Sequence, residues 1–350
     1  MIYKLFNNRI VVKFGGSSVR FSFRETLELV KSLCEGNKVV VVLSALKGVT
    51  DLLLDLSKSK NPELLEKFEE IHLELIERLG IDVNLESEFK ELEFIIKNEK
   101  LFPSIDAYVS HVLSFGERLS VKIFSRSLED HGINATAVDA FYLIKTNEDF
   151  SNAKVDLEKT GKNIWVIEEL LKDSVPIVTG FLGNFNGFRT TLGRGGSDYT
   201  ASVLGRLLNA RAILIMSDVE GIYTADPRIV KDAKIVPFIS YHEALIASRL
   251  GMKALHERAV EPIVGRVPII FGKTSNRKLG SLVSHVSSKM PIITHKISEE
   301  MAKISIVGSP NVDVRWPIAE RADNYVAFLV TRDELENALN ELHEVVFNES

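Results

Sequence analysis

Short apolar runs alternate with amphipathic stretches along most of the chain. The run Ile10–Phe14 ends at Gly15-Gly16, apolar residues recur at helical spacing from Phe23 to Leu33, and Val39–Leu43 is a second apolar run. Strand, helix and strand at this spacing are typical of a parallel sheet with right-handed crossovers. Further strands are expected at Ala135–Asp139, Pro176–Thr179, Ala212–Met216 and Val267–Phe271, and further helices at Ser197–Leu208 and His242–Leu250. The pattern predicts an α/β fold, a doubly wound sheet sandwiched by helices.

One region interrupts this alternation. From Pro62 to Leu101 the chain is rich in Glu, Lys and Leu, and its apolar residues fall on one helical stripe. We therefore expect an inserted pair of helices at about residues 60–101. The doubly wound pattern resumes after it and continues to about residue 285, which predicts one large domain over residues 1–285.

The pattern changes again beyond Pro291. Short strands are expected at Ile304–Val307 and Tyr325–Val330, followed by a helix from Asp333 to about Val345. Thr331 and Glu334 have the spacing of a capping box for that helix. These elements predict a small α+β domain over residues 291–350.

Composition narrows the class of protein. Apolar residues make up 45% and charged residues 26% of the 350 residues, as in ordinary globular proteins, and the net charge of −5 offers no basic field for a nucleic acid. Cys34 is the single cysteine, so no disulfide can form within the chain. The first apolar run is too short for a signal peptide or a membrane span. We expect a cytoplasmic protein with neither nucleic acid nor membrane as a partner.

The segment Lys13-Phe14-Gly15-Gly16-Ser17-Ser18 places a cation at a strand end beside two glycines whose amides can approach an anion closely. Such a segment can form a phosphate site, but the spacing is not that of a P-loop, and most Gly-Gly pairs are simple turns. A tight turn between strand and helix would use the same residues. Both interpretations stay open on this segment alone.

A second glycine-rich segment runs from Thr190 to Asp198. Three glycines surround Arg194, and Ser197 or Asp198 can cap the helix that follows. Arginine can bind a carboxylate through two parallel hydrogen bonds, and the start of a helix adds amide donors. The segment therefore favours a carboxylate site over the alternative, an exposed loop with a capping residue.

The segment Ser217–Arg228 follows the predicted strand Ala212–Met216, so its polar groups fall at the carboxyl edge of the sheet, where open α/β folds bind ligands. An ordinary connection would look similar. Taken singly, Glu117, Thr50 and Lys253 are better explained as surface or capping residues.

Together and in this order, these segments resemble those of the aspartokinases, members of the amino-acid kinase family, over roughly the first 285 residues. Lys13–Gly16 is similar to the opening motif of the family, Gly180–Asp198 to its substrate loop, and Ser217–Arg228 to its nucleotide loop. Leu255-His256 with Arg258–Pro262 resembles a further signature. Ser17 and Ser217 stand where threonine is common, and Glu257 replaces a usual proline.

The resemblance implies a phosphotransferase with a carboxyl group as acceptor. ATP, with Mg²⁺, would phosphorylate the side chain of L-aspartate to 4-phospho-L-aspartate, the first step toward lysine, threonine and methionine, and the enzyme would be a homodimer. Lys13 and Lys253 would neutralise the phosphates, and Asp198 would hold Lys13. Aspartate would be bound by Ser44, Thr50, Glu117, Arg194 and Ser197, with Arg194 on its α-carboxylate and Glu117 on its α-ammonium group. ATP would be bound by Lys13, Gly15, Gly16, Ser17, Ser217, Asp218, Tyr223, Arg228 and Lys253, and no side chain is assigned to a metal.

The region after Pro291 departs from the family pattern. Aspartokinases usually carry two ACT regulatory modules of βαββαβ order, whereas here Ser309–Asn311 is followed at once by Val312–Val314, which is expected to be the next strand. The first ACT helix is therefore expected to be missing, leaving one reduced ACT-like module. Because family ACT pairs bind lysine or threonine beside that helix, we expect feedback inhibition to be weak or absent.

Two alternatives compete with this interpretation. Another amino-acid kinase, acting on acetylglutamate or a nucleoside monophosphate, would share the fold and the ATP loop. Glu117 argues against it. A carboxylate placed for an α-ammonium group finds no positive charge on an acetylated amine, and it repels a phosphate. A silent regulatory subunit is the other alternative, and it would have no need for Lys13, Arg194, Asp198 and Lys253 together.

Overall fold

A computed structural model describes residues 9–309, 312 and 314–348. The chain divides into two compact units, the first formed by residues 1–219 and 273–277 and the second by residues 220–272 and 278–350. Within the described residues, no helix combines the length and the apolar character needed to cross a membrane.

The first unit is built on parallel strands in the order β3-β4-β2-β1-β7. Its strands are β1 (Arg9–Phe14), β2 (Lys38–Leu43), β3 (Ala135–Val138), β4 (Val175–Thr179), β7 (Ala212–Ser217) and the separate pair β5 (Leu182–Phe185) and β6 (Phe188–Thr191). Its helices are α1 (Gly16–Phe21), α2 (Phe23–Cys34), α3 (Val49–Ser59), α4 (Pro62–Leu79), α5 (Glu86–Lys97), the short η2 (Glu99–Leu101), α6 (Ile105–Asp130), α7 (Ala140–Leu143), α8 (Leu157–Gly161), α9 (Trp165–Leu170) and α10 (Gly196–Leu207). The predicted parallel sheet is confirmed.

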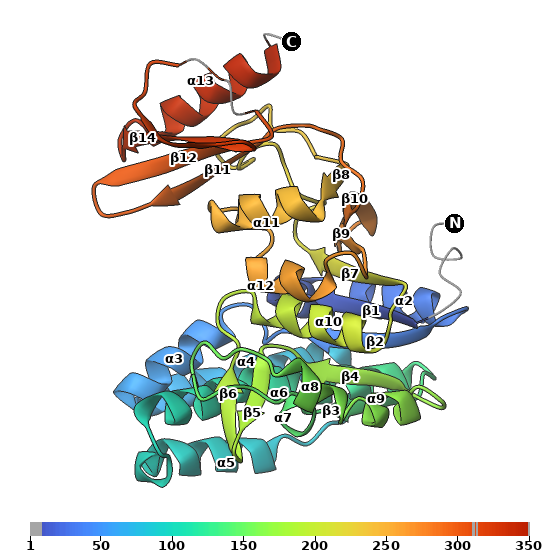
Figure 1. Ribbon diagram of the computed structural model, residues 1–350. Coiled ribbons are helices and arrows are strands. Elements are labelled where there is room, and N and C mark those ends of the chain that lie inside the picture. Colours follow the sequence, from blue (N-terminus) through green and yellow to red (C-terminus); the bar gives the residue numbers. More distant parts are fainter. Residues whose placement is uncertain (1–8, 310–311, 313, 349–350) are drawn as a thin grey trace. The chain divides into compact units, whose positions relative to one another are not determined.

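Strand β1 explains how helices cover both faces of this sheet (Figure 1). Neighbouring residues of a strand point to opposite faces. The ring of Phe14 lies 6.4 Å from that of Phe124 on α6, whereas Lys13 contacts Asp198 on α10. Helices α6 and α10 therefore lie on opposite faces, and Phe23 of α2 packs against Phe124 on the α6 side.

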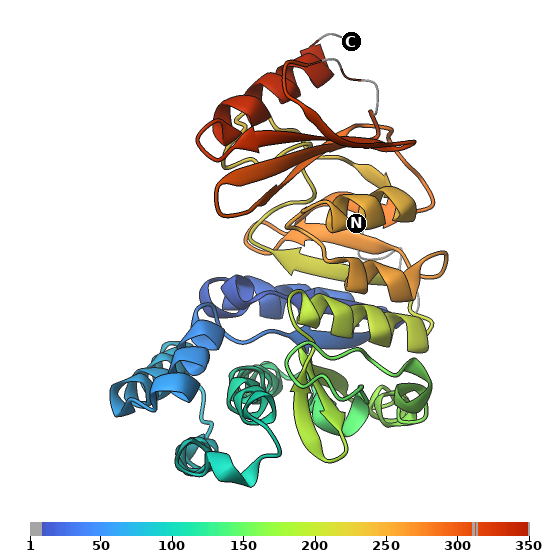
Figure 2. The ribbon, with the colours of Figure 1, turned by 60° about the vertical axis from the view of Figure 1, so that its left-hand side comes forward.

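The second unit combines a small parallel part with an antiparallel sheet. Its elements are β8 (Phe238–Ser240), α11 (Tyr241–Arg249), α12 (Glu257–Val260), the short η3 (Glu261–Ile263), β9 (Ile269–Lys273), β10 (Lys278–Ser284), β11 (Ile292–Ile297), β12 (Met301–Val307), β13 (Ile318–Ala322), β14 (Tyr325–Thr331) and α13 (Leu335–Asn348). Strands β9, β10 and β8 are neighbours in that order, and β11-β12-β14-β13 form the antiparallel sheet. Figure 2 shows α13 lying along this sheet.

A single core joins α13 and the antiparallel sheet to an earlier part of the chain. Ile304 of β12, Phe328 of β14 and Leu339 of α13 are fully buried in one cluster that also contains Ala225 and Val230. The segment that follows β7 in sequence is thus packed into the same core as the C-terminal elements.

Several predictions about local structure were wrong. Val312 and Val314 are outside any strand and Asp313 lies outside the described residues, so the next strand is β13 instead. Helix α13 begins at Leu335, so the Thr331 hydroxyl donates to Glu334 within the preceding turn and not at the helix cap. The hairpin of β5 and β6 was not predicted.

Candidate functional site

A polar cavity of about 270 Å³ lies in the first unit, where β1, β2 and β4 end. This is the carboxyl edge of the parallel strands, as predicted for ligand binding in an open α/β sheet. It is lined by Lys13, Ser44, Thr50, Glu117, Phe181, Gly193, Gly195, Gly196, Ser197 and Asp198. Six of the residues predicted to bind substrate or phosphate therefore meet in one place.

Lys13 and Asp198 form an ion pair in this cavity. The Lys13 ammonium nitrogen lies 2.6 Å from Oδ1 of Asp198, and the two side chains are 11% and 13% exposed. Asp198 lies in the first turn of α10, where the helix dipole favours a negative charge. The pair gives the cavity a cation of fixed position that a phosphate can approach.

Glu117 is the most unusual group of the cavity. It is 3% exposed on α6, and its Oε1 accepts a hydrogen bond of 3.0 Å from the amide of Ala45. Its Oε2 is buried without a hydrogen-bond partner among the described residues. Burial raises the pKa of Glu117 to about 8, against the opposing effect of the Ala45 amide. A carboxyl group left in this state is ready to accept a cationic ligand.

The floor of the cavity depends on a close approach between β4 and α10. A Cβ on Gly180 would lie 2.6 Å from the Cβ and Oγ atoms of Ser197. The Ser44 hydroxyl donates to that of Ser197 across 3.0 Å, which links the ends of β2 and α10. The predicted capping residue was wrong, because Gly195, with a φ of 71°, occupies the N-cap position of α10.

Arg194 and Thr50 differ in how they relate to this cavity. Thr50, in the first turn of α3, is among the lining residues. Arg194 is exposed between Gly193 and Gly195, and its side chain is not among those that line the cavity. The predicted contact of Arg194 with a substrate carboxylate therefore requires its side chain to turn inward, and it stays a prediction.

The predicted phosphate residues of the first unit lie at the ends of β1 and β7. The amide of Gly15 donates to the carbonyl of Met216 across 3.1 Å, which occupies it within the fold. Gly16 and Ser17 begin α1, where helical amides lack a preceding acceptor. Ser217 ends β7, and Asp218 follows it as an exposed residue.

Tyr223, Arg228 and Lys253 lie in the second unit. Arg228 is exposed and binds both oxygens of Asp226, at 3.0 and 2.7 Å, while the Lys253 ammonium nitrogen lies 3.2 Å from Oδ2. These cations hold the pKa of Asp226 well below its usual range. Arg228 and Lys253 therefore meet at one ionised carboxylate, whereas half-buried Tyr223 pairs with Ile235.

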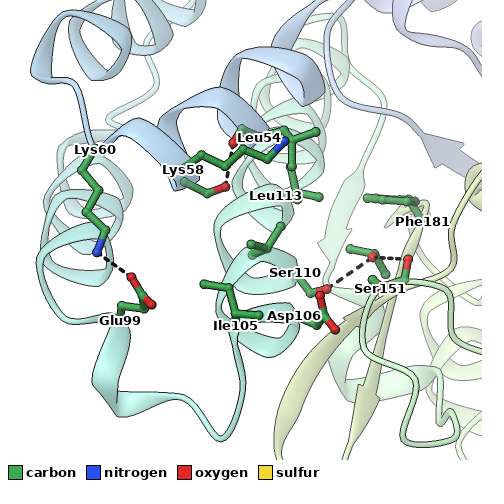
Figure 3. A pocket seen from close by; sticks show the side chains of 13 residues that line it. Leu54, Lys58, Lys60, Glu99, Ile105, Asp106, Ser110, Leu113, Ser151 and Phe181 are labelled. Atoms are coloured by element: carbon green, nitrogen blue, oxygen red, sulfur yellow. Dashed lines mark hydrogen bonds and ion pairs between the residues drawn. The ribbon is translucent and has the colours of Figure 1, made fainter.

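A second cavity, of about 500 Å³, adjoins the first through Phe181. Figure 3 shows Phe181 at the side of this cavity away from the Lys60–Glu99 ion pair, with Leu113 of α6 between them. Phe181 has a φ of 67°, in the left-handed region that favours glycine. Phe181 therefore borders both cavities.

Three residues of these sites were not assigned a role from the sequence. Phe181 lies within the predicted substrate loop, but nothing in the sequence indicates its backbone conformation or its two neighbouring cavities. Asp226 lies within the predicted nucleotide loop, and its position between Arg228 and Lys253 depends on tertiary structure. His295, which contacts Lys253, belongs to β11, a strand that was not predicted.

Comparison with known proteins identifies the family of this chain. The model of the Amino acid kinase family matches residues 8–273. The chain is 35% identical over 274 residues to an aspartokinase of Chlamydia trachomatis, covering 76% of this chain and 62% of that protein. It is 34% identical over 289 residues to the chloroplastic aspartokinase 1 of Arabidopsis thaliana, covering 77% and 50%. The chain thus spans between half and two thirds of the length of these relatives.

A solved structure shares the fold. The aspartokinase III of E. coli, in complex with aspartate and ADP, has a TM-score of 0.85 and 23% sequence identity, with 97% of this chain and 99% of that chain covered. The match to the family model extends over most of the chain. The chain belongs to the amino acid kinase family.

Proposed function

We propose that this protein is an aspartate kinase, which transfers the γ-phosphoryl group of ATP to the side-chain carboxylate of L-aspartate and forms 4-phospho-L-aspartate. The observation that carries the proposal is the buried, unpartnered Oε2 of Glu117 in the same cavity as Lys13. An α-ammonium group would satisfy this oxygen and restore the ionised form of the carboxyl group. The aspartokinase names of the relatives support the same substrate.

The reaction depends on neutralising the repulsion between the aspartate carboxylate and the phosphates of ATP, and it needs no general base to deprotonate the nucleophile. The aspartate side chain has a reference pKa of about 3.9, so the nucleophile is ionised at neutral pH and needs no deprotonation. Two anions must then be brought together in line. Lys13 would hold the phosphoryl group in flight, Asp198 would keep Lys13 in place, and Ser44, Thr50, Arg194 and Ser197 would position the substrate.

ATP binding is proposed for Lys13, Gly15, Gly16, Ser17, Ser217 and Asp218, and in addition for Tyr223, Arg228 and Lys253. The Gly15 amide is already bonded to Met216, so its part is to let the chain turn, and the amides of Gly16 and Ser17 are the better donors.

Mg²⁺ belongs to the same proposal. The described residues contain no cluster of three or more His, Cys, Asp or Glu side chains suited to a metal ion. Mg²⁺ in phosphoryl transfer is commonly held by substrate phosphates and water with one or two carboxylates, so it does not need such a cluster. When bound, it would neutralise charge on those phosphates.

An ATP-dependent hydroxamate assay tests this function. Aspartate and hydroxylamine should give aspartyl hydroxamate, because hydroxylamine traps the acyl phosphate. N-acetyl-L-aspartate is the matched control, since it keeps both carboxylates and removes the ammonium group that Glu117 would bind. Equal rates with both substrates, or a preference for acetylglutamate or a nucleoside monophosphate, would point to a different amino-acid kinase. A nucleoside diphosphate does not react with hydroxylamine, so phosphorylation of the nucleoside monophosphate is measured as release of ADP from ATP. Neither hydroxamate nor ADP from any of these substrates would favour a silent subunit.

The C-terminal part of the proposal concerns architecture and regulation. We propose a catalytic domain over residues 1–285, an ACT-like domain over 291–350, a homodimer and a cytoplasmic location, as the resemblance implies.

No described residue from 308 to 317, between β12 and β13, is helical, which supports the missing first ACT helix and weak feedback inhibition. Light scattering checks the dimer. Strong inhibition by millimolar lysine or threonine would contradict the weak regulation.

A further inference from the structure

The loop that carries Lys253 is fastened to β11 within the second unit. The Thr294 hydroxyl donates to the carbonyl of Leu250 across 3.0 Å. Gly251 has a φ of 112°, and a Cβ at this position would lie 2.5 Å from the carbonyl oxygen of His295. Only glycine allows so close an approach in this conformation. The backbone at Leu250 and Gly251, just before Lys253, therefore lies close against β11.

The side chain of Lys253 contacts β11 as well. Its ammonium nitrogen lies 3.3 Å from Nε2 of His295 and 3.2 Å from Oδ2 of Asp226. An ammonium group has hydrogens to donate and no lone pair, so Nε2 must act as the acceptor. His295 is therefore neutral, with its proton on Nδ1, whenever this contact is made.

The surroundings of His295 favour this neutral form. The imidazole is 6% exposed. Burial, followed by the positive charges of Lys253 and Arg228, lowers the pKa of His295, whereas Asp226 acts in the opposite direction. Among the residues that the structure describes, Lys253, Arg228 and Asp226 are the charged groups that act on the imidazole. Lys253 and Arg228 both contact Asp226, and a protonated His295 would add another positive charge beside them.

We propose that His295 is a positioning residue of the phosphoryl-transfer reaction: its neutral Nε2 holds the ammonium group of Lys253 in the orientation in which that group meets the phosphates of ATP. This inference rests on the proposed function, because it takes Lys253 as a phosphate-binding lysine. Asp226 is the ion-pair partner of Lys253. His295 orients the ammonium group of Lys253 by accepting a hydrogen bond, and because it is neutral it leaves the positive charge of Lys253 in place. More than half of the Lys253 side chain is exposed, so packing alone would not fix the position of its ammonium group.

Steady-state kinetics of three variants test the kinetic side. His295→Ala should lower kcat about tenfold or more, the expected effect of losing a hydrogen bond to a charged group, and leave the KM for aspartate unchanged. His295→Gln offers an amide oxygen as acceptor and should retain more of the rate. His242→Ala is the control, because His242 is an exposed histidine of the same unit whose partner is Asn324. Wild-type kcat in His295→Ala would overturn the proposal.

The pH profile separates positioning from a merely structural role. The pKa of His295 lies below the ordinary histidine value of about 6.5, and protonation of Nε2 removes the acceptor. Wild-type kcat should therefore fall as the pH is lowered through the pKa of His295. His295→Gln cannot be protonated there and should lack this acidic limb. The same acidic limb in the glutamine variant would overturn the proposal.

A labelling experiment reports on the contact without any turnover. A limiting amount of acetic anhydride is added to the intact protein, and acetylation of Lys253 is measured by mass spectrometry. The ammonium group must lose a proton before its nitrogen can attack the anhydride, and the hydrogen bond to His295 opposes that loss. His295→Ala should therefore raise the rate at Lys253 about fivefold, and His242→Ala should not. An unchanged rate would overturn the proposal. If the wild type has no kinase activity, the proposed function fails, and this labelling alone decides whether His295 holds Lys253.

Discussion

The ammonium group of Lys13 is the charge closest to Asp198 in the cavity, at 2.6 Å. Lys13→Ala should lower kcat by about 10²-fold or more, because fixed charge at the transferred group stabilises the transition state. The variant should stay folded, since the first turn of α10 still favours the negative charge of Asp198. The hydroxamate assay and thermal unfolding measure the two effects. Near-normal turnover would contradict the role of Lys13.

Glu117 provides a prediction about proton release. With a pKa of about 8, its carboxyl group is largely protonated at pH 7 in the free protein and must ionise to pair with an α-ammonium group. Aspartate binding at pH 7 should therefore release close to one proton, and the release should vanish as the pH rises well above 8. Calorimetry in two buffers of different ionisation enthalpy measures it.

The control for this titration is Glu117→Gln, which keeps the size of the side chain and removes its ionisation. It should bind aspartate more weakly, and its binding enthalpy should not depend on the buffer. Proton release that persists in the glutamine variant would show that another group titrates.

At the scale of secondary-structure elements, the close approach of the end of β4 to α10 shapes the cavity that contains Lys13 and Glu117. Gly180→Ala should destabilise the protein by about 1–3 kcal/mol and weaken aspartate binding, because its Cβ would lie 2.6 Å from Ser197 and the backbone must shift. Gly36→Ala is the matched control, since its Cβ would meet nothing within 4 Å. Urea unfolding measures both. Equal stability of the two variants would contradict this account.

The same scale shows what a sequence can and cannot reveal. The strands β1, β2 and β7 are mostly apolar and are followed by glycine or polar residues, so they were predicted within about two residues. The hairpin of β5 and β6 was missed although Asn186-Gly187 is a strong turn signal, with φ of 49° and 88°. Its strands are short and mix glycine, asparagine and arginine, which hides the alternation.

Other features depend on contacts between distant residues. Ala225 and Val230 lie in a segment with the composition of a loop, and only the packing of α13 explains their burial. Likewise, the sequence distinguishes neither Oε2 of Glu117 from any other carboxylate oxygen nor His295 from the other histidines.

At the scale of the whole molecule, the C-terminal elements and the segment after β7 share one compact unit. The hydroxyl of Thr224 lies 3.0 Å from Nε2 of the buried His343 on α13, beside the core that contains Ala225. A chain that ends at Ser288 would expose this core. It should therefore lose ATP binding, measured by calorimetry, and its second unit should become sensitive to protease. ATP affinity equal to that of the full chain would contradict this prediction.

Phe181 separates a cavity of about 270 Å³ from one of about 500 Å³, in a backbone conformation that glycine adopts without strain. Phe181→Gly should therefore join the two cavities at little conformational cost. The site should then accept a wider range of acceptor substrates. Longer or branched amino dicarboxylates should become acceptors in the hydroxamate assay, while the rate with aspartate falls. Unchanged selectivity would mean that the wall lies elsewhere. We therefore expect the Phe181 side chain to limit the size of carboxylate that the pocket admits, which makes it a starting point for redesigning the acceptor.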